Sequence, residues 1–216
     1  MTDLLPDGKH ADGSSPGIDP DLLDRADMSG VCAGDDAAMA RLVERHGPGL
    51  LRYLQRMLAH ESDAADLAQE TFVRLHRECR RYDSRRRLRT WLFTIAGNLA
   101  RNQLRWRARH AADSLDEEEP GEPALIQSLP SNVPAPVDAI LDTERKAAVR
   151  DAIDSLPEAM RAALLLVDME DCSMAEASSI LGIPARTVES RLFHGRRRLR
   201  DRLRGALGGT SSSCTA

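Results

Sequence analysis

Residues 173–192 read SMAEASSILGIPARTVESRL, and this stretch predicts two short helices joined by a tight turn. Ser173, followed three residues later by Glu176, is a capping box, a pattern that begins a helix. The letters GIP that follow end it, because glycine allows the turn and proline cannot continue a helix. Val188 and Leu192 then lie four residues apart, on the buried side of the next helix. This is the pattern of a helix-turn-helix, whose second helix can enter a major groove of DNA.

The polar face of that second helix is basic. Eight arginines lie between Arg186 and Arg204, against only Glu189 and Asp201. The first residues of this face could read base edges, and trailing arginines such as Arg196 suit phosphates. A helical hairpin with a solvated basic face is the alternative. The residues predicted to face DNA are Arg186, Thr187, Ser190, Arg191, His194 and Arg197.

A second basic stretch runs from Arg74 to Arg109, where 12 arginines stand against Glu78 and Asp83. Four aromatic residues are interleaved with them: Tyr82, Trp91, Phe93 and Trp106. Arginines beside aromatic rings suit unpaired bases, since the arginines follow the phosphate backbone while the rings stack on bases. Trp91 and Phe93 could instead be core residues of an amphipathic helix. Beside a DNA-binding segment downstream, the pattern favours binding of single-stranded DNA.

An acidic helix precedes this basic stretch. Asp63, Asp66, Gln69 and Glu70 are spaced by three and four residues, which places them on one predicted helix face. Neighbouring carboxylates can form a metal site or an acid–base pair, but no histidine or cysteine nearby completes a ligand set. We therefore expect a solvated or partner-binding face, and no catalytic residues.

Composition favours an all-α fold. The chain is 42% hydrophobic but only 3% aromatic, so aliphatic residues must form its core, and alanine and leucine are strong helix formers. Helical periodicity is predicted to begin near Asp35 and to break at Gly47–Pro48–Gly49. Ser62 is predicted to cap a third helix, and a fourth is predicted from about Leu88 to Arg109.

Two small helical domains are expected. The first covers residues 35–110 and the second residues 137–206. An acidic, proline-rich linker over 111–136 joins them, since proline and charge interrupt the helical pattern there. Flexible tails are predicted at 1–34, which is rich in Asp, Gly, Ser and Pro, and at 207–216.

Charge and cysteine content limit the remaining possibilities. The net charge is −4, so binding to nucleic acid would depend on the arginine blocks, which supply 28 of the 30 basic residues. The cysteines are expected to be reduced thiols, because no CxxC or Cys/His spacing suggests a zinc site, and no metal or cofactor is predicted. No apolar run resembles a signal peptide or a membrane span, which predicts a cytoplasmic protein. The four cysteines are Cys32, Cys79, Cys172 and Cys214.

Four motifs in order resemble the extracytoplasmic-function sigma factors of bacterial RNA polymerase. Asp66–Leu–Ala–Gln–Glu–Thr–Phe72 is similar to the region-two segment that grips the polymerase core. Arg89–Thr–Trp–Leu–Phe–Thr–Ile–Ala–Gly–Asn–Leu–Ala–Arg101 is similar to the segment that opens and reads the minus-ten element. Ser155–Leu–Pro–Glu158 and the helix-turn-helix are similar to region four, which reads the minus-thirty-five element. The resemblance covers roughly residues 36–205.

The resemblance implies an alternative sigma factor that binds core RNA polymerase and directs promoter recognition, DNA melting and transcription initiation, and that is not an enzyme. Its implied partners are the largest polymerase subunits, promoter DNA and an anti-sigma factor, with a monomer as the free form. The implied core-binding residues are Asp66, Leu67, Gln69, Glu70 and Phe72. The implied minus-ten residues are Trp91, Ile95, Ala96, Asn98, Arg101, Asn102 and Arg105.

Two positions depart from the family pattern. Gly97 stands where the family often has a larger, commonly basic residue, and we expect it to let the backbone approach the DNA strand. Glu189 stands where lysine or arginine is frequent, and a glutamate can accept from a cytosine amino group. The alternative function is a stand-alone helix-turn-helix regulator, which region four also resembles. That alternative leaves the two region-two segments unexplained.

Overall fold

The computed structural model describes residues 19–113 and 137–208, and within these ranges every regular element is helical. The expected all-α fold is therefore confirmed. The predicted linker lies outside the described residues apart from its first three positions, which continue a helix. The ends 1–18 and 209–216 lie outside them too.

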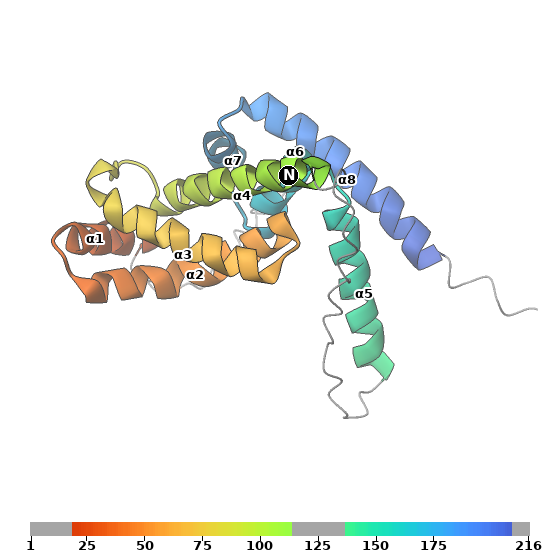
Figure 1. Ribbon diagram of the computed structural model, residues 1–216, viewed down its shortest axis with the longest axis horizontal. Coiled ribbons are helices and arrows are strands. Elements are labelled where there is room, and N and C mark those ends of the chain that lie inside the picture. Colours follow the sequence, from red (N-terminus) through yellow and green to blue (C-terminus); the bar gives the residue numbers. More distant parts are fainter. Residues whose placement is uncertain (1–18, 114–136, 209–216) are drawn as a thin grey trace, which may run out of the picture.

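The first group of helices forms a bundle at one end of the molecule (Figure 1). Its helices are α1 (Pro20–Cys32), α2 (Asp36–Leu58), α3 (Glu61–Arg77), the short 3-10 turn η1 (Cys79–Arg81) and α4 (Leu88–Asp113). The longest, α2, packs against α1, α3 and α4. Leu42, Leu50 and Leu54 of α2 are fully buried, and they meet Leu75 and Leu92 in the core.

The second group contains α5 (Val137–Asp154), α6 (Glu158–Leu164), the π-helical turn η2 (Leu165–Met169), α7 (Met174–Leu181) and α8 (Ala185–Gly208). Helix α8 packs across α5, α6 and α7 and buries Val188 and Leu192, as the sequence predicted. The two groups also touch one another, since α7 packs on α4 and α6 on α2.

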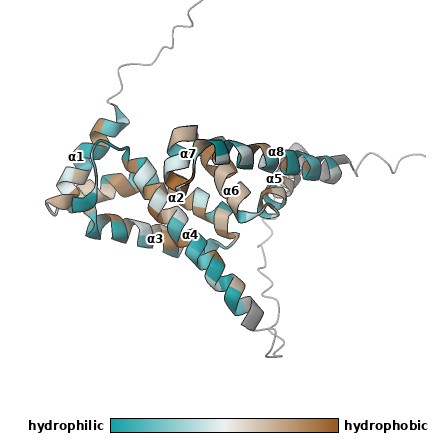
Figure 2. Cartoon of the chain, turned by 90° about the horizontal axis from the view of Figure 1, so that it is seen from above, coloured by the Kyte–Doolittle hydropathy of each residue, from teal (hydrophilic) through white to brown (hydrophobic). Residues whose placement is uncertain are grey.

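Two helices extend beyond the packed core, and their ends carry mostly hydrophilic residues. The C-terminal half of α4 is largely hydrophilic and projects away from the other helices, as does the end of α8 (Figure 2). None of the helices described is long and apolar enough to cross a membrane.

The predicted flexible tail over 1–34 is wrong for the part of it that the structure describes as helix, residues 20–32. These residues form helix α1. Asp19 caps the helix by accepting a hydrogen bond from the backbone N–H of Asp21, and Pro20 stands at its first position, where a missing N–H costs nothing. Met28 and Val31 then bury its apolar side.

Two helix boundaries also differ from their predictions. No break occurs at Pro48, because α2 runs through it and keeps both halves of its apolar face on the core. Ser62 is not a cap, since α3 begins one residue earlier, after His60, and has no side-chain cap. Local turn signals were overridden at both places by tertiary packing.

Candidate nucleic-acid interface

The helix-turn-helix is held by an intact capping box. The Ser173 hydroxyl accepts from the backbone N–H of Glu176 at 3.2 Å, and the Glu176 carboxylate accepts from the backbone N–H of Ser173 at 2.8 Å. Burial alone would raise the pKa of Glu176, but its bonds to Ser173 and to Arg87 outweigh burial and lower that pKa. Gly182 ends α7 with a φ of 65°, and the Ser178 hydroxyl donates to the Ile183 carbonyl at 2.6 Å. The angle between the two helices is thus fixed by local bonds.

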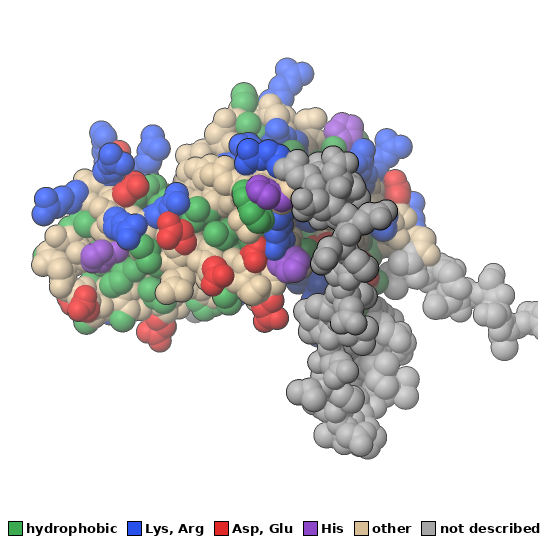
Figure 3. Space-filling model, viewed as in Figure 1, with side chains coloured by type: hydrophobic (Ala, Val, Ile, Leu, Met, Phe, Trp, Pro, Cys, Tyr) green, Lys and Arg blue, Asp and Glu red, His purple; other side chains and the backbone are tan. Residues whose placement is uncertain are grey.

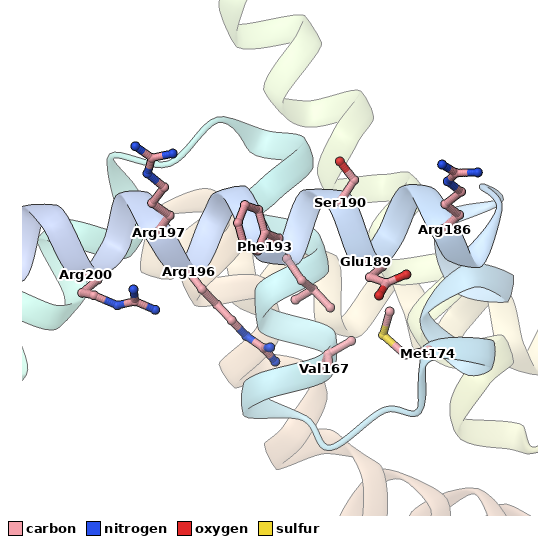
Figure 4. Close-up of a pocket in the computed structure, with 10 residues that line it drawn as sticks. Val167, Met174, Arg186, Glu189, Ser190, Phe193, Arg196, Arg197 and Arg200 are labelled. Carbon is pink, nitrogen blue, oxygen red and sulfur yellow. The ribbon is translucent and has the colours of Figure 1, made fainter.

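Helix α8 carries the predicted reading residues mostly on its solvent side. Four of the six residues are exposed, and the other two, Thr187 and Arg191, are half-buried at the margins of that side. Arg186, Ser190 and Arg197 project to one side of the helix, while Glu189 and Arg196 project to the other (Figure 4). The exposed residues are Arg186, Ser190, His194 and Arg197.

Arg196 has an intramolecular partner, which it would have to exchange in order to bind a phosphate. Its guanidinium lies in a bidentate ion pair with Asp168 of η2, with one N–O distance of 3.0 Å. The pair lies beside an open groove of about 940 Å³ along α8, whose wall includes Val167 and Met174. Phe193 stands at the same groove with 65% of its surface exposed.

Helix α4 gathers most of its predicted residues on one face. Trp91, Ile95, Asn98, Asn102 and Arg105 follow one another at alternating spacings of four and three, which is the repeat of a single helix face. Asn98, Asn102 and Arg105 are exposed, and Trp91 and Ile95 are half-buried.

Side-chain contacts define this α4 face further. The indole of Trp91 stacks on the ring of Tyr82 with centroids 5.6 Å apart. The Asn98 side-chain oxygen accepts from the Arg101 guanidinium at 2.5 Å, in the open. Ala96 is different, because it has no exposed surface and points into the core, so it cannot line a base pocket. Phe93 is likewise a core residue, packed edge-on against Tyr53.

The predicted acidic face of α3 is divided by its contacts. Asp66 and Gln69 are exposed, whereas Glu70 pairs with Arg74 at 2.7 Å. Asp63 turns toward α4, where it accepts from Gln103 at 2.9 Å and pairs with Arg107. Asp63 therefore ties the bundle together instead of joining the free face.

Two other predicted docking residues on α3 are less accessible. Leu67 is half-buried, and Phe72 is only 8% exposed. Phe72 therefore supports the α3 surface from beneath. Among the described residues no cluster of His, Cys, Asp or Glu could hold a metal ion.

Charge is separated over the visible surface. Basic side chains gather along the upper edge, over the loop that precedes α4 and along α8, and acidic side chains lie mostly below them (Figure 3). This separation explains how a chain with a net charge of −4 can present basic faces.

Sequence reasoning missed an ionic clamp between α1 and α2. Asp24 and Asp27 are 2% and 6% exposed, and Arg45 binds both, at 2.5 Å and 2.9 Å. Arg41 adds a bond to Asp27 at 2.8 Å, and His46 adds one to Asp24 at 2.9 Å. The positions of Asp24 and Asp27 within α1 could not predict this clamp, because their partners lie 14 to 22 residues further along the chain.

A second missed feature joins the two groups of helices. Arg89, at the start of α4, donates to the Glu170 backbone carbonyl and to the Glu170 carboxylate, the latter at 3.1 Å. Glu170 is 6% exposed, and Arg52 of α2 approaches it at 3.8 Å. Arg87 bridges to Glu176 of α7 at 3.1 Å. Arginines that were expected to track DNA here hold the start of α4 against α7 and against the segment that precedes α7.

Two family models match the chain. The Sigma-70 region 2 model matches residues 42–110, and the Sigma-70 region 4 model matches residues 146–199. The ECF RNA polymerase sigma factor SigE of Mycolicibacterium smegmatis is 35% identical over 173 residues, which cover 79% of this chain and 64% of that relative. This chain thus spans slightly less than two thirds of SigE.

A shorter relative is covered almost completely. The ECF RNA polymerase sigma factor SigW of Bacillus subtilis is 31% identical over 176 residues, or 81% of this chain and 93% of the relative. Among solved structures, CnrH in complex with the cytosolic domain of CnrY superposes with a TM-score of 0.59 at 25% identity, covering 88% of this chain and 99% of CnrH.

Proposed function

The chain belongs to the extracytoplasmic-function sigma factors, the alternative sigma factors that direct RNA polymerase in transcription initiation, and we propose that it works through three of the surfaces described above. It is an alternative sigma factor and not a stand-alone regulator, because region two accompanies the helix-turn-helix. The proposed domains are 35–110 and 137–206, the first extended by α1. We place the protein in the cytoplasm beside the polymerase and assign it no catalytic residue.

The exposed part of α3 is the proposed docking site for core polymerase. Asp66 and Gln69 offer a carboxylate and an amide to solvent, and half-buried Leu67 adds apolar surface between them. Glu70 is already paired with Arg74, so it would contribute only by exchanging that partner. Phe72 supports the site from below.

The outer face of α4 is the proposed minus-ten reader. A single strand can follow the arginines while bases stack on exposed rings. Asn98 offers a donor and an acceptor at mid-face, which suits the hydrogen-bonding edge of a base turned out of the duplex. The stacked Trp91 and Tyr82 form an aromatic wall at the start of that face.

Helix α8 is the proposed minus-thirty-five reader. Arg186 and Ser190 lie near its N-terminus and project to the same side, as residues that enter a major groove do. Arg197 lies further along that side, where it would meet a phosphate. Glu189 faces the groove beside α8 instead, so its proposed role in base reading is the weaker one.

The single observation that carries this proposal is the presence of two exposed basic helices and a separate exposed face on α3 in one chain. A protein inhibitor is the further proposed partner: the similar protein CnrH was solved with the cytosolic domain of CnrY, and this chain offers an open groove beside α8.

Run-off transcription with purified core polymerase tests the function. A library of templates randomised at the minus-ten and minus-thirty-five elements should yield transcripts only when both the chain and core are present. Asp66→Ala combined with Gln69→Ala should abolish core retention on beads while the circular dichroism spectrum is unchanged. Specific DNA binding by the free chain, without any affinity for core, would contradict the proposal.

A further inference from the structure

Helix α1 and the connection into α4 lie side by side at the same end of the molecule (Figure 1). Helix α1 packs against η1 and against α4. At the start of α1, Asp21 pairs with Arg87 at 3.0 Å. The connection, which consists of η1 and the residues from it to Arg87, therefore runs antiparallel to α1. Its first residue, Cys79, lies near the last residue of α1, Cys32.

The two cysteines at that meeting point lie close together, at the end of α1 and at the start of the η1 turn that packs against it. The Cys79 thiol is near enough to help raise the pKa of Cys32, and both residues are half-buried. The third described cysteine, Cys172, is buried elsewhere against Arg89. Cys214 lies outside the described residues.

We propose that Cys32 and Cys79 are a redox-active pair that closes to an intramolecular disulfide when the chain meets a low-molecular-weight disulfide such as oxidised glutathione. The thiolate of one cysteine attacks a sulfur of the oxidant, forming a mixed disulfide and releasing one small thiol. The thiolate of the second cysteine then attacks the protein sulfur of the mixed disulfide and releases the other small thiol. Two protein thiols are oxidised, one small disulfide is reduced, and both protons pass to the released thiols.

The surroundings of the pair set its speed and its consequence. Burial, together with the Cys79 thiol, raises the pKa of Cys32 to about 11, while Arg80 acts in the opposite direction. Cys32 is thus mostly protonated at neutral pH, which makes the pair a slow responder that needs sustained oxidant. The bond would fasten α1 to η1, just before the loop that leads to the proposed minus-ten reader. Oxidation would therefore stiffen that loop.

The test is peptide mapping of the full chain after incubation with excess oxidised glutathione, followed by alkylation without reductant. One crosslinked peptide pair containing Cys32 and Cys79 is expected, together with the loss of two alkylatable thiols. The variant Cys172→Ala/Cys214→Ala should give the same crosslink. A Cys32–Cys214 or Cys79–Cys214 crosslink, or separate glutathione adducts on Cys32 and Cys79, would overturn the proposal.

Thermal unfolding gives a second readout that does not depend on transcription. Oxidation should raise the Tm of the wild type by several degrees, because the bond closes a long loop of the unfolded chain. The same treatment should leave the Tm of Cys32→Ser and of Cys79→Ser unchanged. An equal shift in either serine variant would place the reactive thiol elsewhere and exclude this pair.

Discussion

Gly97 and Asn98 are neighbours on α4 with opposite surroundings. Gly97 is buried, and a Cβ added there would lie 3.3 Å from the Tyr53 hydroxyl oxygen. Asn98 is exposed and bonded only to Arg101 among the side chains described. The glycine therefore serves packing against α2, and the expectation that it lets DNA approach the backbone is not supported by its position.

Gly97→Ala should destabilise the fold by about 1 kcal/mol, because overpacking displaces a core group. The Tyr53 ring is fully buried and braced edge-on by Phe93 at 5.3 Å, so it has little room to retreat. Urea unfolding at neutral pH measures the change. Gly205→Ala on α8 is the matched control, since nothing lies within 4 Å of its added Cβ. That control should be neutral or slightly stabilising, and equal losses in both variants would refute the packing argument.

Asn98→Ala should change base preference at one minus-ten position and leave core binding intact. The asparagine is exposed and its one side-chain bond is to a neighbour on the same helix, so removing it costs the fold little. Transcription from templates varied singly across the minus-ten element reports the change. A uniform loss on every template would make Asn98 a structural residue, and retention of the wild-type profile would remove it from the reading face.

At the scale of whole elements, short-range signals predicted best. The capping box, the glycine turn and the apolar pairs of α7 and α8 are all set by residues within four positions, and each was correct. Helix α1 was missed because its stability depends on Asp24 and Asp27 meeting partners on another helix, while its composition resembles a solvated tail. Ala96 was assigned to the surface by motif alone, and only packing reveals that it is core.

Asp27→Ala should weaken the attachment of α1 and cost about 2 kcal/mol at pH 7, the scale of lost hydrogen bonds between charged groups. Burial acts to raise the pKa of Asp27, but the hydrogen bonds and charges of Arg41 and Arg45 outweigh it and hold that pKa below 3.8. The Asp27 carboxyl therefore binds its proton less tightly in the folded state than in the unfolded state. The contribution of Asp27 is fully present above about pH 4 and is lost as pH falls through the lowered pKa.

Urea unfolding of wild type and Asp27→Ala at pH 7 and near pH 3 separates these outcomes. The difference between the two proteins should shrink at the lower pH. Asp83→Ala is the control, because its surface pair with Arg85 should contribute nothing measurable. A constant difference across the pH range would mean that the charge of Asp27 is irrelevant and that only its packing counts.

At the scale of the whole molecule, the two groups of helices share a contact centred on Glu170. Its carboxylate receives Arg89 from α4 and faces Arg52 from α2, and the Tyr53 and Met169 side chains close a small cavity beside it. Burial is the largest influence on this group and raises its pKa, even though both arginines act to lower it. Removing a cation and removing the carboxylate should therefore have unequal effects.

Arg89→Gln should destabilise the described structure more than Glu170→Gln, by roughly 1–3 kcal/mol, because it leaves a buried carboxylate without its nearest cation. In the glutamate variant the amide can still accept from Arg89, which is one-third exposed and keeps its solvation. Thermal unfolding of both variants measures the asymmetry.

The raised pKa of Glu170 adds a pH dependence. It means that the folded state holds the carboxyl proton more tightly than the unfolded state, so stability falls as pH rises from about 4.5 through the raised value. Arg89→Gln should enlarge that fall and Glu170→Gln should abolish it; equal profiles in the two variants would show that Arg89 does not stabilise the Glu170 carboxylate in the folded state.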